Sequence, residues 1–208
     1  EDIPLLLSVG KENLYVWEND ESRMHENDAA MVLLDMCKND YMSYGEIKEG
    51  KIELKSEIHG LFKVDRKALF TVNSFGQMMI ATRHSNTVVN PGDKLAGMRI
   101  IPLVIEKEKM DKVLSLVTSP ILEMKPFVLK KAAVITTGSE VYKGRIKDTF
   151  TPVIQEKLAE FGCEMVYHEI CNDDDKMVTE KINEALRQGV DIVLCTGGMS
   201  VDPDDKTP

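Results

Sequence analysis

The pattern of apolar and polar positions changes near residue 126. After this point, apolar runs of strand length alternate with amphipathic stretches of helix length, and the run 132–136 (AAVIT) is continuously apolar, as in strands buried on both faces. This alternation predicts a parallel α/β sheet with right-handed crossovers. The expected strands are 132–136, 163–170 and 190–195, and the expected helices are 148–161 and 173–188.

Before residue 126 the apolar runs are shorter and less regular. Residues 25–38 carry apolar side chains at three-to-four spacing, which predicts a helix. Short alternating runs between residues 46 and 65 suggest a small antiparallel ribbon, and Asp65 is a good N-cap for a helix through residue 70. The other expected elements are β structure at 5–7 and 14–17, strands at 78–82 and 94–105, and a helix at 106–119.

These patterns predict two domains of an α/β protein. We expect residues 1–126 to form a smaller α+β accessory module, to which no motif assigns a function. We expect residues 127–208 to form an α/β domain that continues beyond the end of the chain, because the last residues form a loop after the third strand.

Composition excludes several classes of protein. The 208 residues are 43% hydrophobic and 29% charged, which is typical of a chain that folds around a core. The 35 acidic and 26 basic side chains give a net charge of −9, which argues against non-specific binding to nucleic acid or anionic membranes. No apolar run approaches the roughly 18 residues of a membrane helix. The four cysteines lack C-x-x-C spacing, so we expect reduced, buried thiols and a cytoplasmic, soluble protein.

Two of the expected strand ends carry unusual loops, 137–148 and 196–208. Ligands of open α/β sheets bind beyond the carboxyl ends of the strands, and glycines there let backbone amides approach an anion. The aspartates of the second loop, Asp202, Asp204 and Asp205, suit a divalent cation such as Mg²⁺. One interpretation of these loops is therefore a binding site for a phosphorylated or oxyanionic ligand. The other is that the glycines form ordinary turns and the aspartates form a solvated acidic start of a helix. His168 is expected to pack or to be exposed.

Five motifs that occur in order along the chain favour the ligand-binding interpretation and indicate a particular family. They are TGSEV at 137–141, GRIKDT at 144–149, Asp173-Asp174, DIV at 191–193 leading into TGG at 196–198, and Asp205 followed by Thr207-Pro208. With these motifs, residues 131–208 resemble the molybdopterin-binding domain of molybdenum-cofactor biosynthesis proteins, the MoeA- and MogA-like molybdotransferases and adenylyltransferases. The same domain begins the competence-damage-type CinA proteins.

The resemblance implies a three-layer α/β/α domain that binds molybdopterin, a pterin phosphate, and that forms homo-oligomers. Asp148 and Asp205 would be the catalytic carboxylates, and Asp202 and Asp205 would hold Mg²⁺, with molybdate as a substrate. The implied cofactor-binding residues are Thr137, Gly138, Ser139, Glu140, Gly144, Arg145, Thr196, Gly197, Gly198, Met199 and Ser200.

One departure bears on the reaction. The family commonly has asparagine two residues after the first aspartate, where this chain has Phe150. The leading hypothesis is molybdenum-cofactor maturation, by molybdate insertion as a transferase or by handover to a molybdoenzyme or another biosynthesis protein. The alternatives are a non-catalytic module that carries or senses the cofactor, and a competence-type hydrolase of nucleotide pyrophosphates.

Overall fold

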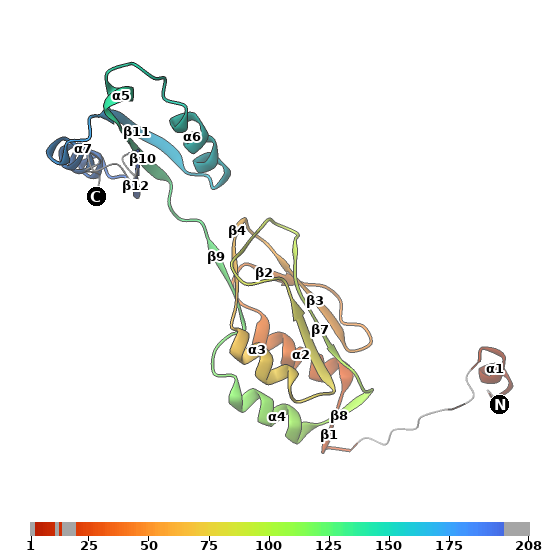
Figure 1. Cartoon of the computed structure of the whole chain (residues 1–208). Coiled ribbons are helices and arrows are strands. Elements are labelled where there is room, and N and C mark those ends of the chain that lie inside the picture. The colour runs from red at the N-terminus through yellow and green to blue at the C-terminus, as the bar shows by residue number, and fades with distance from the viewer. Residues whose placement is uncertain (1–2, 11–12, 14–19, 198–208) are drawn as a thin grey trace. The chain divides into compact units, whose positions relative to one another are not determined.

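The computed structural model describes residues 3–10, 13 and 20–197, and its contacts divide the chain into two compact units (Figure 1). The N-terminal unit is Glu1–Pro126 and the C-terminal unit is Phe127–Pro208. None of the described helices is long and apolar enough to cross a membrane.

The N-terminal unit packs three of its four described helices and small antiparallel sheets around one core. Helix α2 (Glu26–Cys37) buries its apolar stripe, including Leu33 and Leu34, against strand β7 (Lys94–Ile100). The remaining elements are α1 (Ile3–Ser8), β1 (Arg23–His25), β2 (Met42–Tyr44), β3 (Lys51–Ser56), β4 (Gly60–Val64), α3 (Arg66–Asn73), β5 (Met78–Thr82), β6 (Thr87–Val89), β8 (Val104–Glu106), α4 (Lys107–Leu116) and β9 (Leu122–Pro126). The strand orders of the three sheets are β2-β3-β7-β5, β6-β4-β9 and β1-β8.

Most of the expected local elements of this unit are present. Asp65 caps α3 by accepting hydrogen bonds from the amides of Lys67 and Ala68, at 2.9 and 3.0 Å. The expected strand 94–105 is in fact two strands, β7 and β8, and the helix expected to Ser119 ends at Leu116.

The expected antiparallel ribbon is wrong in its pairing. Strand β3 pairs with β2 and β7, whereas β4 pairs with β6 and β9, so the two neighbours in sequence lie in different sheets. The Ser56 hydroxyl bonds both the carbonyl and the amide of Ile58 and turns the chain between the strands. At Gly60 a Cβ atom would lie 2.6 Å from the Lys125 carbonyl oxygen, so the absence of a side chain lets β4 approach β9.

The expectation of β structure at residues 5–7 is also wrong. Residues Ile3–Ser8 form the short helix α1, in agreement with the high helix propensity of leucine, and Gly10 follows with a φ of +75°. The expected strand at 14–17 lies outside the described residues.

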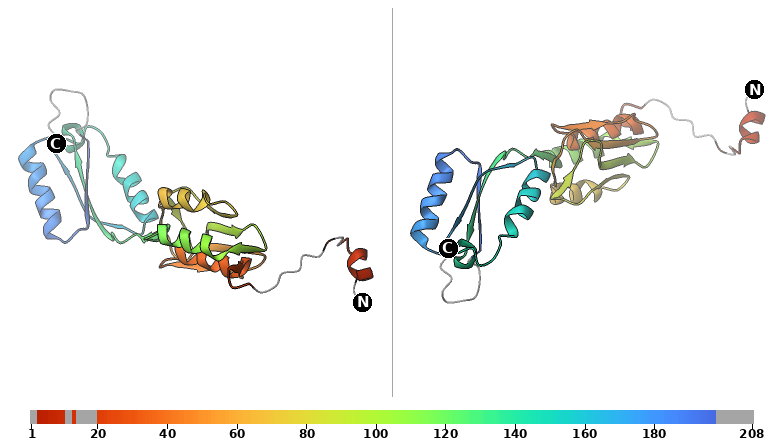
Figure 2. Two further views of the ribbon diagram at one scale, coloured as in Figure 1. Left: turned by 90° about the horizontal axis from the view of Figure 1, so that it is seen from below. Right: turned by 90° about the horizontal axis from the view of Figure 1, so that it is seen from above.

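The C-terminal unit has the expected β-α-β-α-β order and a parallel sheet. Its strands are β10 (Lys131–Thr137), β11 (Glu164–Cys171) and β12 (Ile192–Thr196), in the order β11-β10-β12. Helices α6 (Phe150–Glu160) and α7 (Asp175–Arg187) cover opposite faces of the sheet, so the unit is a three-layer α/β/α sandwich (Figure 2). A short helix that was not expected, α5 (Ser139–Tyr142), follows β10.

Strand β10 is the centre of this sheet. Residues Ala132–Ile135 are completely buried, because strands lie on both sides of them and helices cover both faces. Thr136 and Thr137 end the strand, beside Thr196 of β12 and Cys171 of β11 respectively. The parallel topology therefore brings the first residues of the two unusual loops, Thr137 and Thr196, to the same edge of the sheet.

Candidate ligand-binding site

A cavity of about 240 Å³ opens at the carboxyl ends of β10 and β12. Threonine hydroxyls, one carboxylate and one lysine form its polar wall, and three apolar side chains from α5, α6 and the loop between them form most of the remainder. Its lining residues are Thr136, Thr137, Val141, Ile146, Lys147, Asp148, Thr149, Phe150, Thr196 and Gly197. The cavity therefore offers hydrogen-bonding groups beside an apolar surface.

Asp148 is the carboxylate of this cavity, and its side chain is only 11% exposed. Its Oδ1 atom accepts hydrogen bonds from the amides of Phe150 and Thr151, at 2.9 and 3.1 Å, and so caps the start of α6. Its Oδ2 atom accepts a hydrogen bond from the Thr151 hydroxyl. Both oxygens thus have protein donors.

These donors keep the carboxylate ionised. Burial raises the pKa of Asp148, but the hydrogen bonds from Thr151 and Phe150 and the nearby His168 outweigh burial, so that the pKa lies below its usual value. Asp148 is accordingly a fixed negative charge and hydrogen-bond acceptor, rather than a group ready to take up a proton.

His168 adjoins Asp148 from β11. Its Nε2 atom lies 3.0 Å from the Thr151 hydroxyl oxygen, 3.2 Å from that of Thr136 and 3.6 Å from Asp148 Oδ2. Sequence reasoning expected this histidine mainly to pack or to be exposed, with a ligand role as the minor alternative. No local pattern identifies its role, because the carboxylate and hydroxyls that surround it come from other segments of the chain.

Backbone geometry makes the end of β12 depend on glycine. Gly197 has a φ of +92°, and a Cβ atom there would lie 2.0 Å from the carbonyl oxygen of Thr137. The Thr137 hydroxyl also donates to the Thr196 carbonyl at 3.2 Å. The glycine after β12 therefore permits a close approach to the end of β10 at Thr137.

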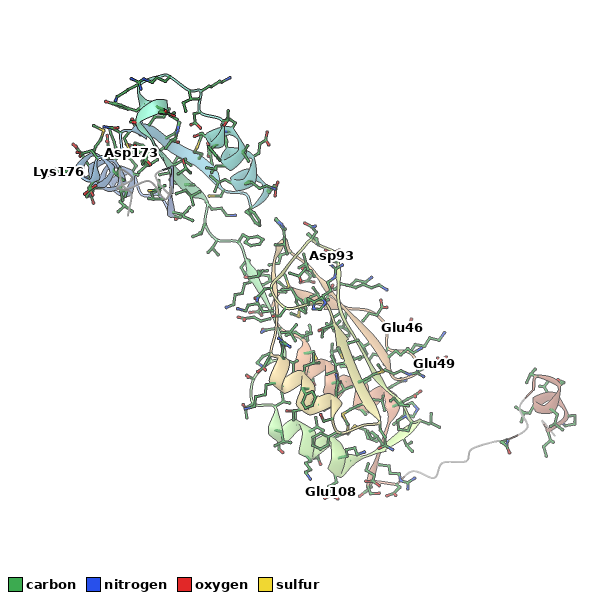
Figure 3. All side chains as sticks on the ribbon, in the orientation of Figure 1. Glu46, Glu49, Asp93, Glu108, Asp173 and Lys176 are labelled. Carbon is green, nitrogen blue, oxygen red and sulfur yellow. The ribbon has the colours of Figure 1, made fainter. Side chains whose placement is uncertain are left out.

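The loop that begins at residue 137 does not present all of its backbone amides to a ligand, as the sequence had suggested. The Ser139 amide donates to Asp173 Oδ2 at 3.0 Å, so this amide is engaged within the protein. Asp173 precedes α7 (Figure 3), and its Oδ1 atom is buried with no hydrogen-bond partner among the described residues. Asp173 thus ties α5 to the segment that leads into α7.

The structure brings some of the expected site residues together. Thr137, Asp148, Thr196 and Gly197 line the cavity. The other expected residues that the structure describes lie on α5 or in the segments that flank it, and they do not line the cavity: Gly138, Ser139, Glu140, Gly144 and Arg145. The remaining ones lie outside the described residues: Gly198, Met199, Ser200, Asp202 and Asp205. Sequence reasoning missed the cavity-lining Thr136, Val141, Ile146, Lys147 and Thr149.

The described residues do not form a metal site. Within residues 3–10, 13 and 20–197, no group of three or more histidine, cysteine, aspartate or glutamate side chains could hold a metal ion. Asp148 is the acid in the cavity wall, and both of its oxygens already accept hydrogen bonds. The expected Mg²⁺ ligands, Asp202 and Asp205, lie outside the described residues.

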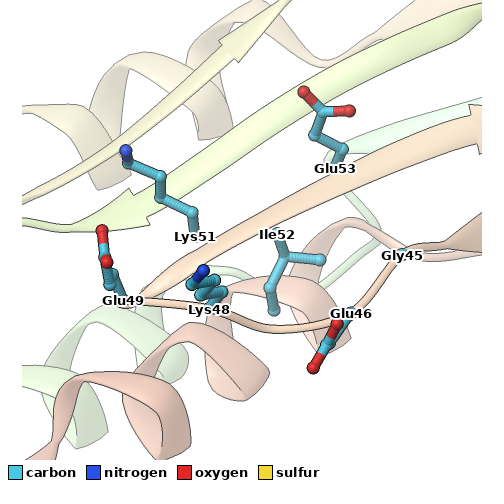
Figure 4. Close-up of a pocket in the computed structure, with 7 residues that line it drawn as sticks. All are labelled: Gly45, Glu46, Lys48, Glu49, Lys51, Ile52 and Glu53. Carbon is cyan, nitrogen blue, oxygen red and sulfur yellow. The ribbon is translucent and has the colours of Figure 1, made fainter.

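The N-terminal unit has a larger but less specific depression of about 430 Å³, at the connection between β2 and β3 (Figure 4). Its acidic and basic side chains, among them Glu46, Glu49 and Lys51, point in different directions. Glu53 at its edge pairs with Lys94 at 2.8 Å. Mixed exposed charges without a common focus do not indicate a particular ligand.

The cysteines are free, as expected, but one of them is not buried. Cys37, Cys163 and Cys171 are buried, whereas Cys195 is exposed. Cys195 belongs to β12, an edge strand that is covered less completely than the central strand β10. An apolar run in the sequence does not distinguish an edge strand from a central one.

Comparison with known proteins agrees with the location of this cavity. Residues 133–208 match the family model described as a probable molybdopterin binding domain. The similarity to that family is confined to this segment of the chain. The matched segment contains every residue that lines the cavity.

Curated relatives and solved structures match a segment of similar length. A CinA-like protein of Mycobacterium tuberculosis is 34% identical over 80 residues, which are 38% of this chain and 19% of the relative. The tungsten cofactor synthesizing protein MoaB from Pyrococcus furiosus is 35% identical, with a TM-score of 0.35 over 37% of this chain and 48% of that chain. The protein CinA from Thermoplasma acidophilum is 31% identical, with a TM-score of 0.35 over 37% of this chain and 45% of that chain. The chain thus spans about a fifth of the length of the curated relatives it matches.

Proposed function

We propose that the C-terminal unit binds molybdopterin in the cavity at the ends of β10 and β12, and that the protein takes part in the biosynthesis or maturation of the molybdenum cofactor in the cytoplasm. One observation carries the proposal: the segment that matches the molybdopterin-binding family encloses a cavity with a fixed carboxylate. The proposed partners are a molybdoenzyme or another biosynthesis protein, and a second copy of this chain.

The cavity wall suits one part of such a ligand. Val141, Ile146 and Phe150 offer apolar contact to a planar ring, and the threonine hydroxyls can donate to or accept from polar ring edges. Lys147 is a suitable partner for a phosphate. At about 240 Å³ the cavity is below the roughly 300–1,000 Å³ of typical small-molecule sites, so it accommodates a ring system rather than the whole pterin phosphate.

Asp148 would orient the ligand by accepting a hydrogen bond from it. Because Asp148 is ionised and held by its own donors, it would not act as a mobile base. Molybdate insertion and a role for Mg²⁺ would require groups beyond the described cavity, and the proposed ones are Asp202 and Asp205. Ser200, Met199 and Gly198 are proposed to complete the cofactor site with them.

A carrier or sensor that binds the cofactor without turnover is a second candidate. Phe150 supports it, because this apolar side chain lines the cavity where the family commonly has asparagine. A carrier would bind molybdopterin equally well but would catalyse no molybdate insertion with any metal.

A competence-type nucleotide pyrophosphate hydrolase is a third candidate. The relatives that are named CinA-like and the sequence Asp204-Asp205-Lys206-Thr207 support it. It predicts metal-dependent cleavage of ADP-ribose, which neither of the other functions would produce.

The test is a fluorescence titration of purified molybdopterin into the 208-residue chain, with and without Mg²⁺. The Asp148→Asn variant should bind at least about tenfold more weakly, because it loses a charged acceptor of the kind that contributes about 1.5–3 kcal/mol. Asp174→Asn is the matched control: Asp174 caps α7 through two amides at 3.0 Å, as Asp148 caps α6, but does not line the cavity.

The outcomes separate the possibilities. Saturable binding that is weakened in Asp148→Asn and unchanged in Asp174→Asn would support the proposed site. Absence of binding by the folded wild-type chain would refute the molybdopterin proposal. Equal weakening in both variants would show that the loss comes from general destabilisation rather than from the cavity.

A further inference from the structure

The hydroxyl of Thr151 joins His168 to Asp148. Thr151 Oγ1 donates to Asp148 Oδ2 and also lies 3.0 Å from His168 Nε2. A threonine hydroxyl has a single proton, and an ionised carboxylate can only accept. Because the Thr151 proton is committed to Asp148, the contact with His168 is a hydrogen bond only if Nε2 carries a proton and donates it.

Thr136 extends the same network. Its hydroxyl oxygen lies 3.2 Å from His168 Nε2, 3.1 Å from Thr151 Oγ1 and 3.4 Å from Asp148 Oδ2. It also accepts a hydrogen bond from the Thr196 hydroxyl at 3.4 Å. Its own proton can therefore point toward Asp148. The hydrogen bonds of the network are therefore donated from side chains of the sheet toward the Asp148 carboxylate.

The two ends of this network differ in how firmly they are held. His168 belongs to β11, where it is in register with the buried Val134 of the central strand. Asp148 lies in the connection between α5 and α6, outside any helix or strand. The hydroxyls thus tie a carboxylate in a loop to a side chain held by the sheet.

We infer that His168 is a positioning residue, whose Nε2–H group orients the hydroxyls of Thr151 and Thr136 and so fixes the Asp148 carboxylate in the wall of the cavity. The hydrogen-bond assignment is independent of what the cavity binds; only the consequence for the cofactor rests on the proposed function. His168 itself does not line the cavity and need not touch a ligand.

The first test follows the tautomer of His168 and the exchange of the amides that Asp148 caps. Long-range ¹H–¹⁵N spectra of the full chain should show His168 with Nε2 protonated. In His168→Leu, the amides of Phe150 and Thr151 should exchange with water about fivefold faster, as expected for the loss of one hydrogen bond. The capped amides of α7, Lys176 and Met177, are the internal control and should be unchanged.

Conservative variants distinguish positioning from packing. The glutamine side chain in His168→Gln retains an N–H donor, so this variant should restore slow exchange at Phe150 and Thr151. Thr151→Val keeps a β-branched side chain of similar size but removes the hydroxyl from the network. It should therefore show the same fast amide exchange that is expected of His168→Leu, and it provides the test if His168→Leu folds poorly. A His168 protonated on Nδ1 alone, or fast exchange in His168→Gln equal to that in His168→Leu, would overturn the inference.

Molybdopterin titration of the same variants separates this inference from the proposed function. Weaker binding in His168→Leu with recovery in His168→Gln would support both. The expected exchange pattern with no binding of molybdopterin by the wild type would leave the positioning role intact and refute the proposed function. Binding by the wild type with unaltered exchange in both His168→Leu and Thr151→Val would refute the positioning role alone.

Discussion

Replacement of Gly197 by alanine should damage the cavity more than the same change at any other glycine that the structure describes in the C-terminal unit. The new Cβ atom would lie 2.0 Å from the carbonyl oxygen of Thr137 and 2.9 Å from its carbonyl carbon. Real Cβ atoms essentially never approach heavy atoms more closely than 3.0 Å, so β12 and the end of β10 must separate by about 1 Å. That movement would strain the hydrogen bond from the Thr137 hydroxyl to the Thr196 carbonyl.

Two costs add up in this variant. A non-glycine residue at positive φ costs about 1–2 kcal/mol, and forced overpacking costs about 1–3 kcal/mol. We therefore expect Gly197→Ala to lower the free energy of unfolding of the C-terminal unit by about 3 kcal/mol. Gly189→Ala is the matched control, because Gly189 has a φ of +73° but nothing within 4 Å of its would-be Cβ. It should lose only the backbone cost of about 1–2 kcal/mol.

The assay is urea unfolding of the full chain, followed by NMR through the amide signals of Ala133 and Ile135 in the buried strand β10. Signals from one unit are needed because a chain with two units need not unfold in a single transition. The steric clash with Thr137 should make the loss of unfolding free energy larger in Gly197→Ala than in Gly189→Ala. Losses that agree within about 0.5 kcal/mol would refute a role for that clash.

Two further predictions concern acid stability and thiol reactivity. The hydrogen bonds that outweigh burial lower the pKa of Asp148 below 3.8 in the folded chain, so its stabilising contribution is present above pH 3.8 and is lost as the pH falls through the lowered value. The urea midpoint of the C-terminal unit should therefore fall less between pH 6 and about pH 3 in Asp148→Asn than in the wild type; an equal fall would contradict this assignment. A water-soluble thiol reagent should label the exposed Cys195 first, and should label Cys37, whose pKa burial raises to about 12, only on unfolding. Mass spectrometry of the labelled peptides checks the order, and labelling of Cys37 as fast as Cys195 in the folded chain would contradict it.

The sequence alone was sufficient for the local elements of the C-terminal unit apart from the short helix α5. Helices α6 and α7 and the three strands follow from apolar periodicity and from glycines at their ends, and the continuously apolar run of β10 indicated burial on both faces. The cap of α3 by Asp65 could also be predicted, because an N-cap bonds amides only two and three residues away. Signals of this kind depend on neighbours in the sequence.

Strand partners were beyond the reach of the sequence. The alternation in β3 and β4 shows that each has an inward face, but it is compatible with either strand pairing with the other. Their separation into two sheets depends on the Ser56 turn and on the close contact of Gly60 with Lys125, which is distant in the chain.

For the candidate site, the motifs pointed to the edge of the sheet where the cavity opens and to Asp148 in its wall, because strand ends and glycine loops are visible locally. Only the tertiary structure decided how that carboxylate is held. His168, Thr136 and Asp148 come from β11, β10 and a loop, and hydrogen bonds at 3.0–3.4 Å join them through Thr151 or directly. Periodicity along the chain specifies which face of an element is buried, whereas the partners of a polar side chain depend on the packing of segments that are distant in sequence.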